Sequence, residues 1–276
     1  MTTSTAISFD RIAASYDTVR AHRPDVAVQI GKSIAAAAGQ GARVLELGVG
    51  TGRIALPAAH AGCHVTGVDI SLEMLRVAQV GDHAGPGDHA EPPLRLIRGD
   101  IAALPVADAA FDAVLAVHVL HLVPDWRVAL AEAMRALRPG GVFIMGRDWR
   151  DPQSCAGRLR GKLREVVVQL RPDLKPPAAG AAVPQALARL GAVPEGEVVA
   201  AVWQSAESPA QVLAEMAARS DAETWVLDDD TLSEALARLR AWAEELYTDL
   251  TAPETVERRF VLSIARKEQR AGAGEG

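Results

Sequence analysis

The chain has 276 residues, enough for one large domain or for one domain that carries an insertion. Hydrophobic residues make up 49% of the sequence and charged residues 23%, which excludes a wholly disordered protein. The formal net charge is -6 and no basic run is present, so non-specific nucleic-acid binding is disfavoured. Because no apolar stretch has transmembrane length and the first residues do not resemble a signal peptide, we expect a cytoplasmic protein without a membrane span.

The first predicted element is an amphipathic helix near the N-terminus. Phe9, Ile12, Ala13 and Tyr16 recur at the spacing of one helix face. Such an apolar face most often packs against a core. The sequence therefore predicts a helix that precedes the regular alternation of elements further along the chain.

Residues 40–147 alternate short apolar runs with helical stretches, which is the pattern of βα units around a parallel sheet. Ser71 and Asp125 are suited to cap helices that run to about Val80 and about Leu137. Five runs are predicted as strands: Arg43–Leu47, His64–Val68, Leu94–Arg98, Ala113–Val117 and Gly141–Gly146. The sequence therefore predicts an α/β fold.

The regular alternation ends after Arg147. The remaining sequence predicts two helices, Ala156–Leu170 and Gln185–Leu190, and two strands, Glu197–Trp203 and Arg258–Ala265. It also contains two capping boxes that predict the start of further helices, Ser208–Gln211 and Thr231–Glu234. We expect these helices to be insertions docked on the parallel sheet. The tail, Lys267–Gly276, is predicted to be disordered.

A glycine-rich loop follows the first predicted strand. Gly48, Gly50 and Gly52 occur as G-x-G-x-G, and Arg53 occupies the position where a dinucleotide fingerprint has its third glycine. A pyrophosphate would need helix N-terminal amides, whereas an adenosine with an amino-acid arm needs close backbone and an acid for its ammonium group. Glu46, two residues before the first glycine, is such an acid.

The next two strands also end in carboxylates. Asp69 follows the second strand, where a carboxylate can accept hydrogen bonds from both ribose hydroxyls. This position by itself does not separate dinucleotide sites from other adenosine sites. Asp100 follows the third strand and could accept from an exocyclic amine, while the Ile101 amide donates to a ring nitrogen. Together these groups predict the recognition of an adenine.

Several segments, in this order, resemble the motif series of class I S-adenosylmethionine-dependent methyltransferases: VLELGVGTGR, GVDIS with Met74 nearby, GDIAALP, FDAVLAVHVLHLV and LRPGG. Phe9–Asp17 resembles the leading helix of the small-molecule branch of that family. The resemblance covers about residues 9–147. It implies a Rossmann-like, mostly parallel seven-stranded sheet whose last strand is antiparallel, with helical substrate-cap insertions. The implied parts are an N-terminal lid helix (1–30), a cofactor-binding core (31–147) and a substrate cap with the last two strands (148–266).

The resemblance also implies that S-adenosyl-L-methionine is the cofactor. Glu46 and the glycines would surround its methionine moiety, and Asp69 would hold the ribose. Ile70 and Met74 would lie on the two faces of the adenine, with Asp100 and Ile101 at its edge. The implied cofactor-binding residues are Tyr16, Arg20, Glu46, Gly48, Gly50, Thr51, Gly52, Asp69, Ile70, Met74, Asp100, Ile101 and Val117.

The methyl group of a sulfonium is already activated, so the protein mainly positions a nucleophile, and no metal is required. His118 and His121 follow the fourth strand, and one of them is a candidate for a general base; the alternative is a packing or helix-capping role. Arg147 could meet an anion and Trp149 could stack on a flat substrate. The expected acceptor is a small natural-product or quinone-like molecule, methylated on oxygen, nitrogen or carbon.

Two alternatives remain open at this point. One is a nicotinamide-dependent oxidoreductase, against which Arg53 and Asp100 argue. The other is a methyltransferase-fold protein that binds the cofactor without transferring a methyl group. The sequence does not decide between transfer and binding alone, and it leaves the oligomeric state open.

Overall fold

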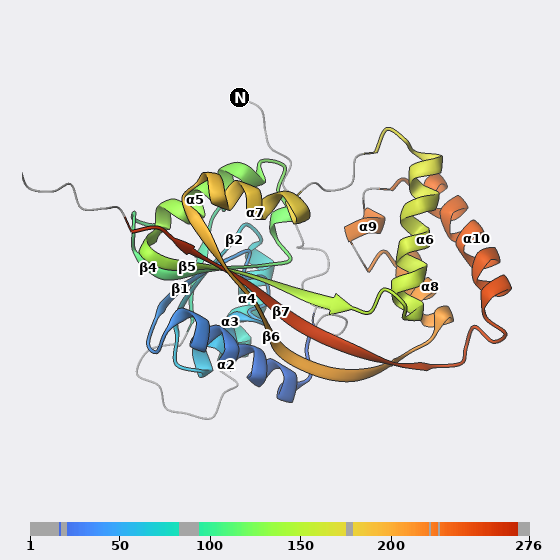
Figure 1. Cartoon of the computed structure of the whole chain (residues 1–276), viewed down its shortest axis with the longest axis horizontal. Coiled ribbons are helices and arrows are strands. Elements are labelled where there is room, and N and C mark those ends of the chain that lie inside the picture. The colour runs from blue at the N-terminus through green and yellow to red at the C-terminus, as the bar shows by residue number, and fades with distance from the viewer. Residues whose placement is uncertain are drawn as a thin grey trace, which may run out of the picture. The chain divides into compact units, whose positions relative to one another are not determined.

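The structure is a computed structural model that describes residue 17 and residues 21–82, 94–174, 179–220, 222–225 and 227–269 (Figure 1). The helix predicted around Phe9–Tyr16 lies outside the described residues, and so do Tyr16 and Arg20. The predicted tail is described only as far as residue 269. Lys267, which the sequence assigns to that tail, is instead the last residue of a strand.

Seven strands form one sheet in the order β3-β2-β1-β4-β5-β7-β6. Their bounds are β1 (Arg43–Leu47), β2 (His64–Asp69), β3 (Leu94–Arg98), β4 (Phe111–Val117), β5 (Leu137–Arg150), β6 (Ala192–Glu207) and β7 (Glu254–Lys267). Strand β1 pairs in parallel with β2 and β4, β2 pairs in parallel with β3, and β4 with β5. The last strand, β7, is antiparallel and lies between β5 and β6. The predicted Rossmann-like seven-stranded sheet is therefore confirmed.

Helices cover both faces of this sheet. Figure 1 shows α2 and α3 on one face and α5 and α7 on the other. Their bounds, with those of α4 and the short helix η1, are α2 (Pro24–Ala38), α3 (Ala55–His60), α4 (Leu72–Asp82), η1 (Leu120–Leu122), α5 (Trp126–Ala136) and α7 (Ala179–Arg189). The strands between them are apolar on both faces, and Leu45, Leu115 and Phe143 are fully buried. Because of this burial, the sheet packs tightly between the two layers of helices.

Helix α2 is an element that sequence reasoning missed. Its signals are present, since Pro24 stands in the first turn, and Val26, Ile30 and Ile34 are buried at four-residue spacing. The predicted boundary at residue 30, between a lid helix and the core, falls inside this helix.

The motif Leu137–Gly141 also differs from its prediction. The sequence predicts a helix that runs to about Leu137 and a strand that begins at Gly141, but the strand already begins at Leu137. Gly140 has φ +76°, and the pairing register with β4 shifts between Phe111 and Ala113. The bulge absorbs the turn residues, so they lie within the strand rather than before it.

Residues 148–176 and 202–259 form a second compact unit with a hydrophobic core of its own. Its helices are α6 (Cys155–Leu170), α8 (Pro209–Ala217), α9 (Ala222–Trp225) and α10 (Asp229–Leu246), of which α6, α8 and α10 pack together. The first unit comprises residues 1–147, 177–201 and 260–276, and the division falls within β5, β6 and β7. The sequence predicted docked insertions, whereas the structure gives these helices a separate core. Their role as a substrate cap stays a prediction.

One of the two predicted capping boxes in this second unit is confirmed. Ser208 caps α8 and accepts from the Gln211 amide, as expected. The second prediction is wrong, because Asp228 caps α10 by accepting from the amide of Thr231. Aspartate is as good an N-cap as threonine, and here it stands three residues earlier.

None of the described helices is long and apolar enough to cross a bilayer.

Arg135 on α5 organises the loop that follows β3. Its guanidinium donates to the carbonyl oxygens of Leu104 (3.1 Å) and Val106 (2.9 Å) and to the carboxylates of Glu132 and Asp108. The hydrogen bonds that Arg135 donates to Glu132 and Asp108 raise the pKa of Arg135, so its charge is retained. This loop connects β3 to β4.

Replacement of Arg135 by methionine should therefore destabilise the protein. We expect Arg135→Met to lower the free energy of unfolding by about 1–3 kcal/mol, because two backbone carbonyls lose a charged donor. The control is Arg138→Met, which removes an arginine that is half exposed and pairs with Asp112 at 2.7 Å; its effect should stay below about 1 kcal/mol. Urea unfolding measures both, and equal losses would contradict the assigned role of Arg135.

Candidate active site

The carboxyl ends of β1 to β4 open into one cavity, at the edge where open α/β sheets bind ligands. Eleven of the residues singled out from the sequence line this cavity together: Glu46, Gly48, Gly50, Thr51, Asp69, Ile70, Met74, Asp100, Ile101, Val117 and His118. The structure thus brings residues from four strand ends to one place. All of them belong to the first unit.

The glycine loop after β1 needs glycine for two physical reasons. Gly48 adopts φ +63°, a left-handed conformation that side chains rarely tolerate. A Cβ atom at Gly48 would also lie 2.4 Å from the Cγ2 atom of Val119, so the loop approaches the turn after β4 too closely for any side chain. Gly52 does not line the cavity and instead turns the chain toward α3.

Glu46 is a buried acid in the cavity wall. Its side chain is only 2% exposed, and its Oε2 atom has no hydrogen-bond partner among the described residues. Burial raises the pKa of Glu46 to about 8; Arg53 acts in the opposite direction, and Asp69 adds to the rise. An unsatisfied buried oxygen is unfavourable unless a ligand supplies a donor, so Glu46 is ready to receive one.

Asp69 connects the loops that surround the cavity. Its Oδ2 atom accepts from the Gly50 amide and its Oδ1 atom from the Ser71 amide, both at 2.8 Å. Its backbone oxygen accepts from the Gly99 amide at 2.9 Å, which joins the loop after β3. A carboxylate oxygen can accept more than one hydrogen bond, so these two amides do not by themselves exhaust the acceptor capacity of Asp69.

The predicted adenine residues line the same cavity at different depths. Met74 is 3% exposed and is held by α4, whose first turn Ser71 caps as predicted by accepting from the Met74 amide. Ile70 is exposed, and Ile101 is buried. Asp100 is exposed, and its Oδ1 atom accepts from the Ala102 amide at 2.8 Å. These residues supply apolar side chains and a carboxylate edge.

The structure separates the two candidate histidines. His118 lines the cavity and has φ +50°, a left-handed backbone conformation uncommon for a residue other than glycine. His121 lies in η1 and is not among the residues that line the cavity. Only His118 is therefore placed where a ligand in the cavity could meet it.

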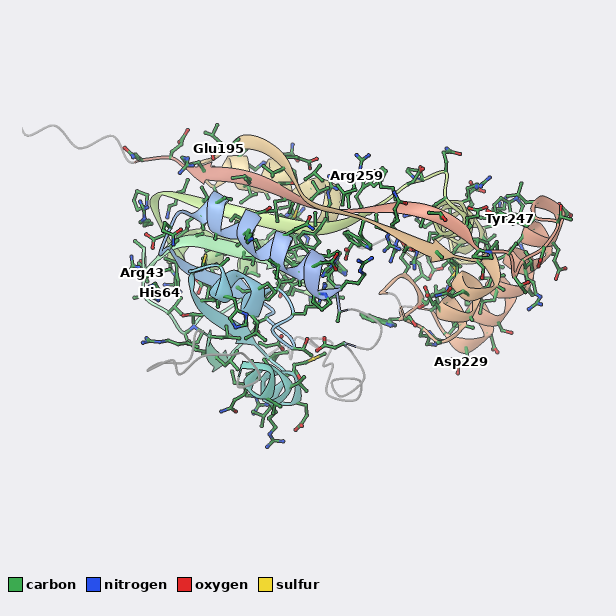
Figure 2. All side chains as sticks on the ribbon, turned by 90° about the horizontal axis from the view of Figure 1, so that it is seen from below. Arg43, His64, Glu195, Asp229, Tyr247 and Arg259 are labelled. Atoms are coloured by element: carbon green, nitrogen blue, oxygen red, sulfur yellow. The ribbon has the colours of Figure 1, made fainter. Side chains whose placement is uncertain are left out.

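Arg147 and Trp149 have other partners and do not line the cavity. Arg147 ion-pairs with Glu197 at 2.8 Å, and Ser263 donates to the same carboxylate at 2.7 Å. Trp149 is covered by the guanidinium of Arg259, 4.5 Å from the ring centroid; Figure 2 labels Arg259 on its strand. Their roles in substrate binding stay predictions.

The sequence reasoning missed several residues of the cavity wall. Arg53 lines the cavity and lowers the pKa of Glu46, although the sequence had suggested only that it replaces a third glycine. Asp125 lines the cavity and is the N-cap residue of α5, as predicted, but its side chain makes no capping hydrogen bond. The position of Arg53 directly after the glycine loop was the signal that could have identified it.

Comparisons with known proteins agree with this architecture. A family model described as a methyltransferase domain matches residues 45–145. The demethylmenaquinone methyltransferase of Renibacterium salmoninarum is 40% identical over 105 residues, which are 38% of this chain and 40% of that protein. The protein of the same name from Streptomyces avermitilis is 37% identical over 149 residues, which are 51% of this chain and 58% of the relative. The chain spans about half the length of these curated relatives.

The shared architecture extends to solved structures. A Bacillus halodurans protein described as a candidate methyltransferase has a TM-score of 0.59 at 16% identity, over 87% of this chain and 99% of that one. At this identity the likeness shows the fold alone. The stretch matched by the family model begins in β1, ends in β5 and contains every residue that lines the cavity. Residues 45–145 of this chain are therefore similar to a methyltransferase domain, and the fold is shared with solved structures described as methyltransferases.

Proposed function

We propose that this chain binds S-adenosylmethionine in the cavity and transfers its methyl group by direct displacement to a small-molecule acceptor. One observation carries the proposal: Glu46, buried and with an unpartnered oxygen, faces the cavity whose loops Asp69 holds together. An acid in this setting suits a ligand that carries both an ammonium group and a ribose. An ionised Glu46 would repel a phosphate or a pyrophosphate.

We assign each group of lining residues to one part of the cofactor. Glu46 and the loop of Gly48 and Gly50 hold the amino-acid arm, and Asp69 accepts from the ribose hydroxyls. The adenine lies between Ile70 and Met74, with Asp100 and Ile101 at its edge. When bound, the cofactor supplies a methyl group on a positively charged sulfur, and the protein has to align the acceptor and exclude water.

We propose a quinone-like acceptor, with oxygen, nitrogen or carbon as the methylated atom. The support is the name of the relatives, demethylmenaquinone methyltransferase, together with the apolar turn after β4, where Val119, Leu122 and Val123 line the cavity. His118 stands in this turn and is the candidate to remove a proton from the acceptor. Cofactor binding without methyl transfer is the competing outcome, which turnover with an acceptor panel distinguishes.

Asp69 provides the first test of this proposal. We expect micromolar binding of S-adenosylmethionine and of S-adenosylhomocysteine to the wild type, and a loss of about tenfold or more in Asp69→Asn, because an amide cannot accept from two backbone amides and a ribose at once. Isothermal titration measures this, with NAD as the competing ligand. The control Asp112→Asn, at the opposite end of β4, should bind normally. Binding of NAD alone would contradict the proposal.

Glu46 provides a second test through pH. With a pKa of about 8, Glu46 is protonated in the free protein at lower pH and must ionise to meet an ammonium group. Binding should therefore release a proton, and affinity should rise by up to about tenfold per pH unit below the pKa and level off above it. Titration across this range measures the slope. In Glu46→Gln the slope should disappear; a wild-type affinity that does not change with pH would refute this role of Glu46.

His118 provides a third test, of the chemical step. Asparagine tolerates the left-handed backbone, so His118→Asn should remove the base without unfolding the turn. If His118 accepts the proton, kcat should fall by about 10²–10⁴-fold with little change in cofactor affinity. His121→Asn is the matched control and should retain turnover. An unchanged kcat in His118→Asn would leave His118 with a packing role only.

A further inference from the structure

Thr51 is the one hydroxyl-bearing residue of the glycine loop, between Gly50 and Gly52. Its side chain is 4% exposed and lines the cavity. The Oγ1 atom donates to the Oδ1 atom of Asp17 at 2.7 Å. A hydroxyl has a single proton and a carboxylate accepts only, so the direction of this bond is determined. Thr51 therefore keeps lone pairs, and no proton, for any other partner.

Asp17 is held in place by the residues that follow it. The Ala21 amide donates to the backbone oxygen of Asp17 at 3.0 Å. His22 packs edge-on against the fully buried Phe260, with ring centroids 5.4 Å apart, and its Nδ1 atom lies 3.3 Å from Nη1 of Arg53. Asp17 and His22 thus contact Thr51 and Arg53, the side chains on both sides of Gly52.

A second acceptor lines the same cavity. Glu46 is buried, and its Oε2 atom has no hydrogen-bond partner among the described residues. If the Thr51 hydroxyl pointed its proton toward the cavity, it would favour a ligand carboxylate. Because Thr51 donates that proton to Asp17 in a hydrogen bond, Thr51 and Glu46 both offer acceptors to a ligand. A ligand group that suits both is a donor with several protons, such as an ammonium group.

We propose that Asp17 is a positioning residue that fixes the polarity of Thr51, so that this part of the cavity recognises the ammonium group of an amino-acid arm. The inference rests on the proposed cofactor and adds a residue that does not line the cavity. It requires that Asp17 affect only those ligands that carry the ammonium group. A residue that merely stabilises the loop would affect every ligand that occupies the cavity.

The test compares two ligands by isothermal titration: S-adenosylhomocysteine, and its deaminated analogue, which keeps the carboxylate and lacks the ammonium group. In Asp17→Asn the side-chain amide can donate to Thr51 and release its proton. We expect the affinity for S-adenosylhomocysteine to fall about tenfold, while that for the deaminated analogue is unchanged or improved. Asp25→Asn, an exposed carboxylate of α2 that pairs with Arg23, is the control and should change neither affinity.

A double-mutant cycle connects the effect to Thr51. Thr51→Val removes the hydroxyl, so Asp17→Asn should have no further effect on S-adenosylhomocysteine in that background, whereas Thr51→Ser keeps the hydroxyl and should retain the sensitivity. Equal losses for both ligands, an undiminished effect in Thr51→Val, or no loss in Asp17→Asn would each overturn the proposal. If the wild type binds neither ligand, the proposed cofactor itself is wrong. Thermal melts confirm that the variants fold.

Discussion

The geometry of the cavity depends on Asp69. Three loops that follow adjacent parallel strands meet at this residue, because its two carboxylate oxygens accept from Gly50 and Ser71 and its backbone oxygen accepts from Gly99. The in-register pairing of β1 with β2 brings the loops to the same level before these bonds form. Asp69 therefore connects the three loops and fixes the Gly50 amide of the glycine loop.

Around this frame the cavity contains a polar group that the protein itself does not satisfy. Burial of Glu46 opposes its ionisation and raises its pKa to about 8, so the apo protein keeps an acid in an unfavourable state. Functional sites often carry such destabilising groups, because the ligand supplies the missing partner. The tightly packed strands beneath, with Leu45, Leu115 and Phe143 fully buried, provide the stability that allows it.

The candidate site was predictable where one loop or one strand end carries the information. Glu46 precedes the glycines, Asp69 and Asp100 end their strands, and all three line the cavity. The sequence did not separate two neighbouring candidates for a general base. His118 and His121 are three residues apart and equivalent in sequence, yet only the left-handed turn at His118 brings it to the cavity.

By itself, the sequence determined the α/β class, the succession of strands along the chain and the resemblance to a family, because periodicity, caps and glycine spacing are local signals. The tertiary structure alone decided the contact between Asp17 and Thr51, 34 residues apart, and the division of the chain into two units within β5, β6 and β7. It also decided that the β5 bulge absorbs Gly140. These features arise from pairing between distant segments, which no local pattern encodes.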